Sequence, residues 1–328
     1  PVGITRAGRW LLPGDVERAL REGPEAAGGT PVVLLPDPTV RGLLPLSPRG
    51  EPAGPPIPVD VVFPVLHGTF GEDGTVQGLL ELAGVAYVGA GVLASAVGMD
   101  KVVMKDLFVR HGLPVVRYRA FLRRTWRCRP ERVLAEVEAE LGYPVFVKPA
   151  NLGSSVGISR ASDRQALARG LEEAARYDRK LLVEKAVVGA REIEVSVLGN
   201  DEPEASVPGE VVPATEFYTY DAKYRDPGTR LLVPAPLPPA QVEEFRRLAV
   251  AAYRAIDCAG MARVDFFLAP HGSIYVNEIN TIPGFTQVSM YPRLWQHGGM
   301  DYPALVDRLI RLALERWREL QELSRTYG

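Results

Sequence analysis

The 328-residue sequence exceeds the size of one ordinary hydrophobic core, so two or three subdomains are expected. Its 46% apolar and 24% charged residues are ordinary for a globular protein and exclude an intrinsically disordered chain. The 38 basic and 40 acidic residues give a net charge of -2, which excludes a strongly basic surface for nucleic acid.

The sequence also lacks the patterns of membrane and disulfide-rich proteins. No apolar run approaches the roughly 20 residues that a membrane helix needs, and no signal-peptide pattern opens the chain. The two cysteines, Cys128 and Cys258, lie far apart and lack the spacing of a zinc site. We therefore expect a soluble, cytoplasmic protein without nucleic-acid or membrane partners, in which both thiols are buried.

The first 92 residues predict the start of an α/β domain. The opening PVGITRAGRW predicts a strand and turn whose partner strand should precede it, so we expect an upstream strand to be missing. Residues 59–66 form a continuous apolar run, as in a strand covered on both faces of a parallel sheet. A glycine-rich turn then leads into a helix, at the strand end where such sheets bind ligands. We predict an N-terminal substrate domain over residues 1–92, truncated at its start.

Residues 93–185 predict a central domain that alternates helices and strands. It includes a glycine and serine loop, GSSVG, between two strands. The elements expected are helices at residues 93–112, 130–142 and 162–177, and strands at 115–121, 143–149 and 180–188.

Residues 186–328 predict a C-terminal domain. An alternating strand at 191–199 is followed by a long irregular segment, 213–234, whose three tyrosines favour a functional loop. A helix at 238–257 then leads to a hairpin. The closing helix, 302–325, carries leucines at helical spacing that indicate core packing, namely Leu305, Leu309 and Leu312.

The hairpin ARVDFFLAPHGSIYVNEINTIPGFT, residues 262–286, places acids inside an apolar pattern. If His271 and Gly272 form the centre of a two- or four-residue turn, opposed residues have numbers that sum to 543. Asp265 then faces Glu278, and Arg263 faces Asn280, with all four on one sheet face. The opposite face would hold the apolar side chains Val264, Phe266, Leu268, Tyr275 and Ile279.

Two interpretations of these acids stay open from the residues alone. Carboxylates held opposite one another repel unless a positive charge lies between them. Oxygen ligands from Asp265, Glu278 and Asn280 are what Mg²⁺ takes, with phosphate and water completing its shell. The alternative is a salt-bridge cluster centred on Arg263. A three-residue turn would shift the register and remove the argument.

Candidate phosphate ligands occur elsewhere, although no Walker-type phosphate loop is present. Lys148 ends an apolar strand, and the GSSVG loop, residues 153–157, offers backbone N–H groups and the hydroxyls of Ser154 and Ser155. Lys101 lies in a predicted helix and Glu184 ends a strand. The alternatives are a plain turn, a surface lysine and a surface acid.

These candidate residues lie in motifs through which the sequence resembles the D-alanine–D-alanine ligases of the ATP-grasp superfamily over nearly its whole length. The motifs that carry the resemblance stand in the family's order and spacing: LHGTFGEDGTVQGLLELAGVAYVGAGVLASAVGMDK, FVKPANLGSSVGI, REIEVSVLGN, YDAKY, RVDFF and NEINTIPGFT. The fold implied is α/β: a parallel-sheet domain at the N-terminus, a small central α+β lid domain and a C-terminal antiparallel-sheet domain.

The resemblance implies roles for particular residues. It implies that ATP and D-alanine are the substrates and that two Mg²⁺, or Mn²⁺, are bound by Asp265, Glu278 and Asn280, with Glu278 bridging. The residues that it implies for ATP are Lys101, Lys148, Ser155, Glu184, Lys185, Ala186, Val187, Glu192 and Lys223. Those that it implies for the reacting groups and the D-alanines are Arg263, Ser154, Tyr224, Gly284, His67, Ser289 and Met290. For His67 the alternative is a histidine that merely packs at a strand end.

The implied chemistry is transfer of the ATP γ-phosphoryl group to the carboxylate of one D-alanine, followed by attack of the amine of a second. Arg263 and the Gly284 N–H would stabilise the oxyanion of the tetrahedral intermediate. The YDAKY segment with Tyr224 favours D-alanine as the second substrate, in a set that includes Ser154. A homodimer is also implied.

One departure from the family pattern is the missing N-terminal loop with its acid, which would bind the amine of the first alanine. We therefore expect the 328-residue chain to bind ATP but to condense D-alanine poorly. Two other functions stay open: a different ATP-grasp carboxylate–amine ligase, and a nucleotide-binding module without turnover.

Overall fold

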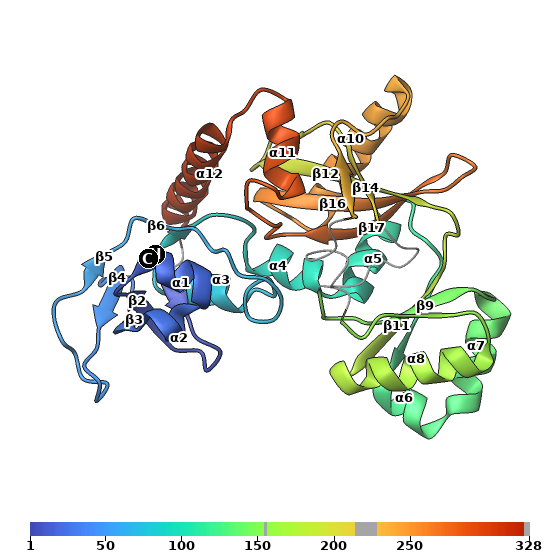
Figure 1. Ribbon diagram of the computed structural model, residues 1–328, viewed down its shortest axis with the longest axis horizontal. Coiled ribbons are helices and arrows are strands. Elements are labelled where there is room, and N and C mark those ends of the chain that lie inside the picture. Colours follow the sequence, from blue (N-terminus) through green and yellow to red (C-terminus); the bar gives the residue numbers. More distant parts are fainter. Residues whose placement is uncertain (154–155, 214–227, 325–328) are drawn as a thin grey trace. The chain divides into compact units, whose positions relative to one another are not determined.

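A computed structural model describes residues 1–153, 156–213 and 228–324 (Figure 1). The chain divides into two compact units. The first comprises Pro1–Phe63, Val76–Val88 and Ala313–Gly328, and the second comprises Pro64–Thr75 and Gly89–Leu312. Within the described residues, no helix combines the length and apolar character needed to cross a membrane.

The first unit is built on a five-stranded antiparallel sheet with the strand order β1-β2-β3-β4-β5. Its strands are β1 (Gly3–Ile4), β2 (Trp10–Pro13), β3 (Gly29–Leu34), β4 (Gly42–Pro45) and β5 (Ile57–Pro58). Helices α1 (Val16–Glu22) and α2 (Pro24–Ala27) connect β2 to β3. The opening strand β1 pairs with β2, which follows it, and the predicted upstream strand stays a prediction.

Parallel pairing in the first unit joins β6 (Val61–Val62) to β7 (Ala86–Tyr87). The apolar run at 59–66 therefore yields a parallel strand as predicted, but a shorter one. The described end of α12 (Tyr302–Glu322) belongs here too: Trp317 Nε1 donates to the Gly84 carbonyl at 2.9 Å.

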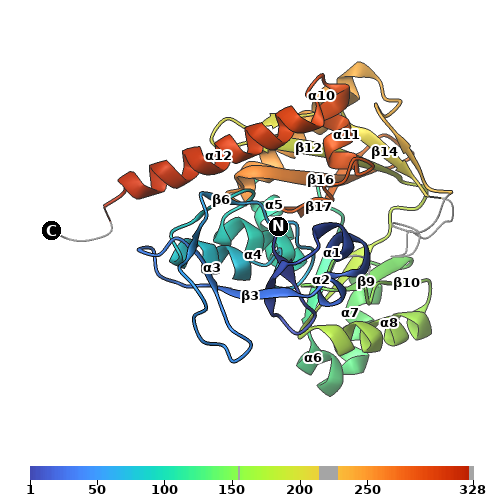
Figure 2. The same cartoon turned by 60° about the vertical axis from the view of Figure 1, so that its left-hand side comes forward.

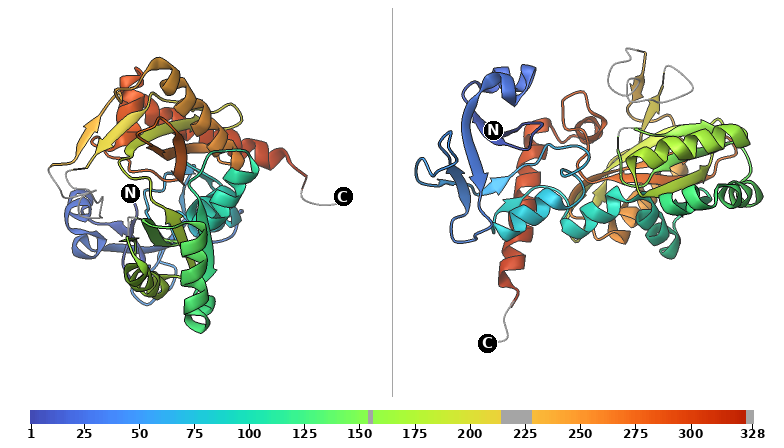
Figure 3. Two further views of the ribbon diagram at one scale, coloured as in Figure 1. Left: turned by 90° about the vertical axis from the view of Figure 1, so that its right-hand side faces the viewer. Right: turned by 90° about the horizontal axis from the view of Figure 1, so that it is seen from below.

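The central part of the second unit is a four-stranded antiparallel sheet, with the order β10-β9-β11-β8, covered by helices (Figures 1 and 3). Its elements are β8 (Tyr118–Leu122), α6 (Arg123–Cys128), α7 (Pro130–Glu140), β9 (Val145–Pro149), β10 (Ser159–Ala161), α8 (Arg164–Tyr177) and β11 (Lys180–Lys185). Side chains of α6, α7 and α8 pack with β9 and β11 in one apolar core. All but α6 were predicted.

The predicted helix at 93–112 is two helices, α4 (Val92–Met99) and α5 (Lys101–Arg110). Asp100 separates them in an extended conformation, and its carboxylate accepts the backbone N–H groups of Val102 and Val103. An aspartate in this position satisfies N–H groups that a helix start leaves unpaired, so it begins a new helix. Lys101 is thereby the first residue of α5.

The second sheet of this unit has the order β15-β14-β12-β16-β17, with β13 beside β12. Its elements are β12 (Arg191–Gly199), β13 (Glu204–Ala205), β14 (Gly209–Val212), β15 (Arg230–Leu232), α10 (Pro239–Ala255), β16 (Gly260–Leu268) and β17 (Ile274–Asn280). Helix α10 packs on one face of this sheet (Figure 2). There Phe245 meets Phe266 edge to face. Strand β15 lies inside the segment predicted as irregular.

Three further helices lie in the described part of the chain: α3 (Thr75–Leu82), α11 (Met290–His297) and α12. Helix α3 follows the glycine-rich turn as predicted, whereas α11 was not predicted. The α12 leucines are buried as expected, each at most 2% exposed. Cys258 is buried as predicted, but Cys128 is exposed at the end of α6, so the prediction for that thiol is wrong.

The β16–β17 hairpin has the predicted pairing for an unpredicted reason. Asp265 faces Glu278 and Arg263 faces Asn280, which confirms the register at the acids. Nearer the turn the register differs, because Leu268 faces Ile274 and a three-residue loop with Gly272 at φ 90° joins the strands. A β-bulge between Asp265 and Phe266 restores the pairing by leaving one extra residue on β17.

The bulge also changes which side chains face the core. Val264, Phe266, Leu268 and Ile279 are buried as predicted. The prediction for Tyr275 is wrong, because Tyr275 pairs with Phe267 and Val276 takes the core position instead.

Candidate active site

Two cavities in the second unit bring most of the predicted site residues together. The first, named here the lysine cavity, has a volume of about 580 Å³ and is lined by Lys101, Lys148 and Lys185. The second, the His67 cavity, has a volume of about 430 Å³. Lys101 and Glu278 line both cavities, so this pair of side chains marks the place where the two meet.

The lysine cavity collects all the predicted ATP-binding residues that the structure describes. These are Lys101, Lys148, Glu184, Lys185, Ala186, Val187 and Glu192. They come from the start of α5, from β9, from the end of β11 with the residues that follow it, and from β12. Residues far apart in the sequence thus line one space, because antiparallel pairing of β9 with β11 places Lys148 opposite Leu182, two residues from Glu184.

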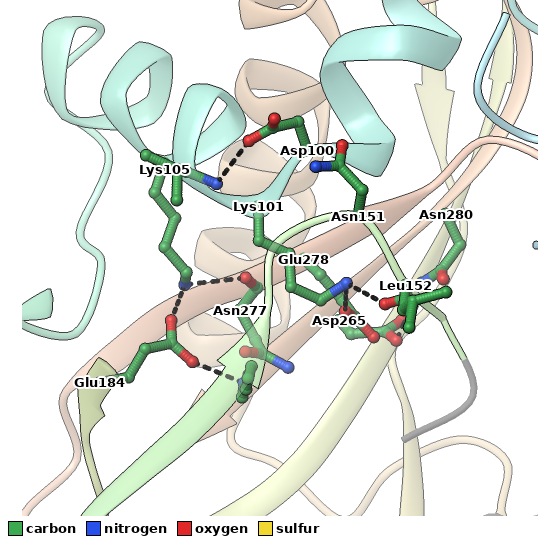
Figure 4. A network of polar contacts seen from close by, with 12 residues as sticks. Asp100, Lys101, Lys105, Asn151, Leu152, Glu184, Asp265, Asn277, Glu278 and Asn280 are labelled. Carbon is green, nitrogen blue, oxygen red and sulfur yellow. Dashed lines mark hydrogen bonds and ion pairs between the residues drawn. The ribbon is translucent and has the colours of Figure 1, made fainter. Parts of the chain in front are cut away.

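A buried trio of charges lies at the floor of the lysine cavity. Glu184 Oε1 is 2.7 Å from Lys105 Nζ (Figure 4). Glu184 Oε2 is 2.5 Å from Lys148 Nζ. Burial by itself would raise the pKa of the Glu184 carboxyl, but Lys105 and Lys148 lower that pKa to about 2. Burial lowers the pKa of Lys105, against the effect of Glu184. The carboxylate is therefore ionised. Its side chain is only 3% exposed, which excludes a solvated surface acid.

Lys105 was not predicted as a site residue. It stands one helical turn after Lys101 on α5, so the (i, i+4) spacing of the two lysines was the signal in the sequence. The side chain of Lys105 is 1% exposed, and its ammonium also donates to the Asn277 carbonyl at 3.0 Å.

Lys101 connects the lysine cavity to the acids of the hairpin. Its ammonium donates to the Leu152 carbonyl at 2.7 Å and lies 3.7 Å from Glu278 Oε2 (Figure 4). The side chain is 8% exposed, which excludes a solvated surface lysine. Leu152 immediately precedes the glycine and serine loop, so Lys101 binds the start of that loop as well as the hairpin.

The hairpin acids form a network with Arg263. Its Nε and Nη2 each lie 2.7 Å from an oxygen of Asp265, and Nε lies 3.1 Å from Glu194 on β12. The Asn280 amide donates to Asp265 Oδ2 at 3.0 Å. Burial would lower the pKa of Arg263, but the neighbouring carboxylates of Asp265 and Glu194 raise it well above its usual value. Glu194, which pairs directly with Asp265 across the strands, was not predicted.

The donor set at this end of the hairpin fits a divalent cation. Asp265, Glu278 and Asn280 supply oxygen donors from two neighbouring strands, which is the chemistry that Mg²⁺ prefers. Across residues 1–153, 156–213 and 228–324, no three His, Cys, Asp or Glu side chains form a metal-binding group by themselves. The hairpin set has two carboxylates and an amide, and it needs phosphate or water oxygens to complete a shell.

The His67 cavity gathers the residues predicted for the reacting substrates. Those that line it are His67, Arg263, Gly284, Ser289 and Met290, and they are joined there by Glu278 and Asn280 of the predicted metal site. Ser289 Oγ lies 2.8 Å from Thr286 Oγ1 and accepts the Thr286 N–H at 3.1 Å, which fixes the turn after Gly284. A side chain on Gly284 would come within 3.0 Å of Ser289 Oγ, so glycine keeps this backbone close to the cavity.

Glu72 is a further residue of the His67 cavity that was not predicted. Its Oε2 accepts the Gly68 N–H at 2.6 Å. Burial raises its pKa, whereas the Gly68 N–H, His67 and Arg263 lower it, and the net direction is upward. The acid stands in the glycine-rich turn HGTFGEDG, where an acid five residues after His67 was the available signal.

Four predicted residues lie outside the described part of the chain. They are Ser154 and Ser155 of the glycine and serine loop, and Lys223 and Tyr224 of the long segment. Their assignments stay predictions.

The fold and these cavities define a class of protein. A central sheet and a C-terminal antiparallel sheet enclose a cavity with lysines, beside a second cavity with paired carboxylates and an arginine. This is the ATP-grasp fold of carboxylate–amine ligases, and the predicted fold class is confirmed. Within it, the parallel pairing predicted for the N-terminal domain is confined to β6 and β7.

Comparisons with known proteins identify the family. Residues 107–311 match the model described as "D-ala D-ala ligase C-terminus", and residues 1–90 match "D-ala D-ala ligase N-terminus". The chain therefore belongs to the D-alanine–D-alanine ligase family, and the predicted resemblance is confirmed.

Individual relatives agree with this family. The D-alanine–D-alanine ligase of Heliobacterium modesticaldum is 55% identical over 98% of this chain and 86% of its own length. That of Geobacillus kaustophilus is 49% identical over 100% of this chain and 88% of its own length.

Two solved structures resemble the fold closely. The D-alanine–D-alanine ligase of Coxiella burnetii superposes with a TM-score of 0.82 at 36% identity, covering 98% of this chain and 85% of that one. The VanG D-Ala:D-Ser ligase of Enterococcus faecalis gives 0.85 at 37% identity, covering 95% and 89%.

Proposed function

We propose that this chain joins two D-alanine molecules into D-alanyl-D-alanine at the expense of ATP, for peptidoglycan synthesis. The γ-phosphoryl group passes to the carboxylate of the first D-alanine, giving ADP and an acyl phosphate. The amine of the second D-alanine attacks the acyl carbon, and the tetrahedral intermediate collapses with release of phosphate and loss of the amine proton. Family membership supports this reaction.

The observation that carries the proposal is the junction of the two cavities. Phosphoryl transfer needs the nucleotide phosphates and the accepting carboxylate to meet in line, within a site that neutralises charge. Lys101 and Glu278 line both cavities, so a nucleotide in the lysine cavity would present its phosphates beside the His67 cavity.

In the lysine cavity, the proposed roles are those that the family resemblance implies. Lys101 and Lys148 would bind phosphate oxygens, Glu192 the ribose, and the residues from Glu184 to Val187 the adenine. The short stretch after β11 is suited to adenine, because residues that follow a strand end can offer backbone N–H and C=O groups to a planar base.

In the His67 cavity, Arg263 and the Gly284 N–H would stabilise the oxyanion that forms when the amine attacks. Burial and its bonds to Asp265 and Glu194 hold the guanidinium in one place, which is what preorganised stabilisation requires. His67 would line the place of the first D-alanine, and Ser289 and Met290 that of the second.

Two divalent cations, Mg²⁺ or Mn²⁺, would be held by Asp265, Glu278 and Asn280. When bound, such ions neutralise the charge that spreads over the transferring phosphoryl group. The protein's own part is to keep the two carboxylates opposite each other on β16 and β17, which the bulge secures. Lys101, 3.7 Å from Glu278, adds a fixed positive charge at the same place.

A second candidate differs only in the amino acid that supplies the amine. The D-Ala:D-Ser ligase of Enterococcus faecalis shares the fold at a TM-score of 0.85, so the architecture accommodates more than one acceptor. D-alanine is favoured here by the YDAKY motif, whose Tyr224 lies outside the described residues. A cytoplasmic homodimer belongs to the same proposal and rests on the family resemblance.

Phosphate release from ATP and Mg²⁺ tests the proposal, with D-alanine or D-serine added, alone and together. Release that depends on D-alanine alone, with D-alanyl-D-alanine as product, agrees with it. Release that requires D-serine favours the second candidate. Nucleotide binding without release under any of these conditions would refute both and leave a binding module.

A further inference from the structure

The chain is unusually sparing with lysine. It holds 32 arginines and only six lysines, at positions 101, 105, 148, 180, 185 and 223. Three of them line the lysine cavity. Lys105 does not line it, but forms an ion pair with Glu184, which does. Arginine and lysine both carry positive charge, but lysine presents a compact ammonium that fits a small buried space. Four of the six lysines therefore lie at or under one site.

Lys105 has no direct access to that site. Its side chain is 1% exposed and it does not line either cavity. Its ammonium meets Glu184 Oε1 at 2.7 Å and the Asn277 carbonyl at 3.0 Å. A buried ammonium is costly unless its charge is compensated, so these contacts are needed for it to be tolerated.

The charges of the trio do not cancel. Lys105 and Lys148 share a single carboxylate, Glu184, so the three groups carry one net positive charge. Without Lys105, Glu184 and Lys148 would form a neutral pair 2.5 Å apart. A neutral pair attracts a phosphate much less than an uncompensated ammonium does.

Lys105 also contacts the β16–β17 hairpin, through the carbonyl of Asn277. Asn277 is the extra residue of the β-bulge on β17, adjacent to Glu278. A bulge leaves a residue outside the regular ladder, and the Lys105 ammonium bonds to the carbonyl of this one (Figure 4). Lys105 thus influences Lys148 through their shared partner Glu184, and it also contacts the strand that carries Glu278.

We infer that Lys105 is a positioning residue for nucleotide binding: from outside the cavity it neutralises Glu184, so that the charge of Lys148 remains available to the phosphates of the nucleotide. This inference rests on the proposed ATP site. It assigns no contact with the nucleotide to Lys105 itself.

The test compares ligands with and without phosphate, using calorimetry on the whole chain. In Lys105→Met the affinity for ATP should fall about tenfold or more, because the trio becomes neutral. The affinity for adenosine should stay within about twofold, since adenosine has no phosphate groups for Lys148 to attract. A merely structural role would weaken both ligands together. Arg164→Met, which removes a cation from its pairs with Glu131 and Glu138, is the matched control and should change neither affinity.

A second variant tests the charge argument directly. Adding Glu184→Gln to Lys105→Met restores one net positive charge, so most of the lost preference for ATP over adenosine should return. Glu184 is proposed to lie beside the adenine, so its replacement should weaken both ligands alike, and the ratio of the two affinities cancels that loss. If Lys105→Met alone does not fold, the double variant still decides, because its ratio of ATP affinity to adenosine affinity should lie within about threefold of that of the natural chain. Unchanged ATP affinity in Lys105→Met, a parallel loss for adenosine, or a double variant whose ratio is lower by about tenfold or more would overturn the inference.

Failure of the inference can be told apart from failure of the proposed function. The natural chain is measured alongside for ATP binding and for D-alanine-dependent phosphate release. A natural chain that does neither refutes the proposed function. A natural chain that does both, with Lys105→Met indistinguishable from it, refutes only the role of Lys105.

Discussion

Two carboxylates of this protein stand beside lysines on neighbouring sheets, yet their surroundings differ. Glu184, on β11, is 3% exposed at its side chain, and each of its oxygens lies within 2.7 Å of an ammonium. Glu278, on β17, is 22% exposed, and its lysine, Lys101, is 3.7 Å away. The first acid is committed to internal charges, whereas the second remains accessible from two cavities.

We propose that the first acid fixes the charge and position of its lysines, whereas the second can bind a ligand. A carboxylate held by two buried cations is expensive to disturb, so it controls the charge and position of its partners. A half-buried carboxylate with a longer ion pair can exchange that contact for a cation or a substrate. If the two acids differ as proposed, replacing each of them should have a different consequence.

The largest effect is expected at the accessible acid. Glu278→Gln should reduce D-alanine-dependent phosphate release by about 10³-fold or more, because the amide removes the negative charge that holds cations against the phosphates. Circular dichroism and melting temperature should stay close to those of the natural chain. Glu243→Gln, which alters an exposed ion pair with Arg246 on α10, is the matched control. Retained turnover in Glu278→Gln would contradict the proposed role.

The next effect concerns stability at the committed acid. Glu184→Gln leaves two buried ammonium groups without an anion, which should lower the free energy of unfolding by about 3–5 kcal/mol. Urea denaturation measures this, with Glu173→Gln as the control, because Glu173 pairs with Arg176 on the exposed side of α8. A loss no larger than that of the control would mean that the trio is not a stabilising unit.

Low pH should reveal the contribution of the Glu184 carboxylate to stability. The pKa of Glu184 is about 2 in the folded chain and lies below its ordinary value of 4.5. A group whose pKa is lowered by folding stabilises the fold above its unfolded pKa and ceases to do so as the pH falls through the folded value. Stability should therefore decline as the pH falls from about 4.5 to about 2. Melting curves over this range should show a smaller decline in Glu184→Gln, and equal declines would count against the assignment.

The smallest effect is expected where an ion pair is exposed and serves no site. Arg311 and Asp307 lie 2.7 Å apart on α12, with side chains 68% and 62% exposed. Arg311→Ala should change the free energy of unfolding by no more than about 0.5 kcal/mol. A change as large as that of Glu184→Gln would show that burial does not distinguish these pairs.

The sequence allowed the facing acids to be predicted, because period-two alternation places Asp265 and Glu278 on one face in any register that opposes them. It did not reveal that a three-residue turn and a bulge together produce that register. The three-residue turn shifts the register by one residue, and the bulge shifts it back, so the pairing at the acids is as predicted. Between the turn and the bulge the shift persists, which is why Tyr275 was assigned to the wrong face. A pattern of side chains cannot by itself locate an extra residue in a strand.

The lysines show the same limit from another direction. Lys101 and Lys148 were predicted from the family motifs that contain them. Lys105 was missed, because a lysine in a helix is usually solvated and only the packing of α5 beside β11 and β17 reveals its burial. The helix start at Lys101 depended on Asp100 as a cap, a signal present in the sequence but overridden by the apolar run around it.

The most direct test of the whole account is a crystal structure with a non-hydrolysable ATP analogue, D-alanine and Mn²⁺, whose anomalous signal locates the ion. The account predicts ion density in contact with Asp265, Glu278 and Asn280, and nucleotide phosphates bound by Lys101 and Lys148. Phosphates bound away from both lysines, or an ion that avoids the hairpin acids, would contradict it.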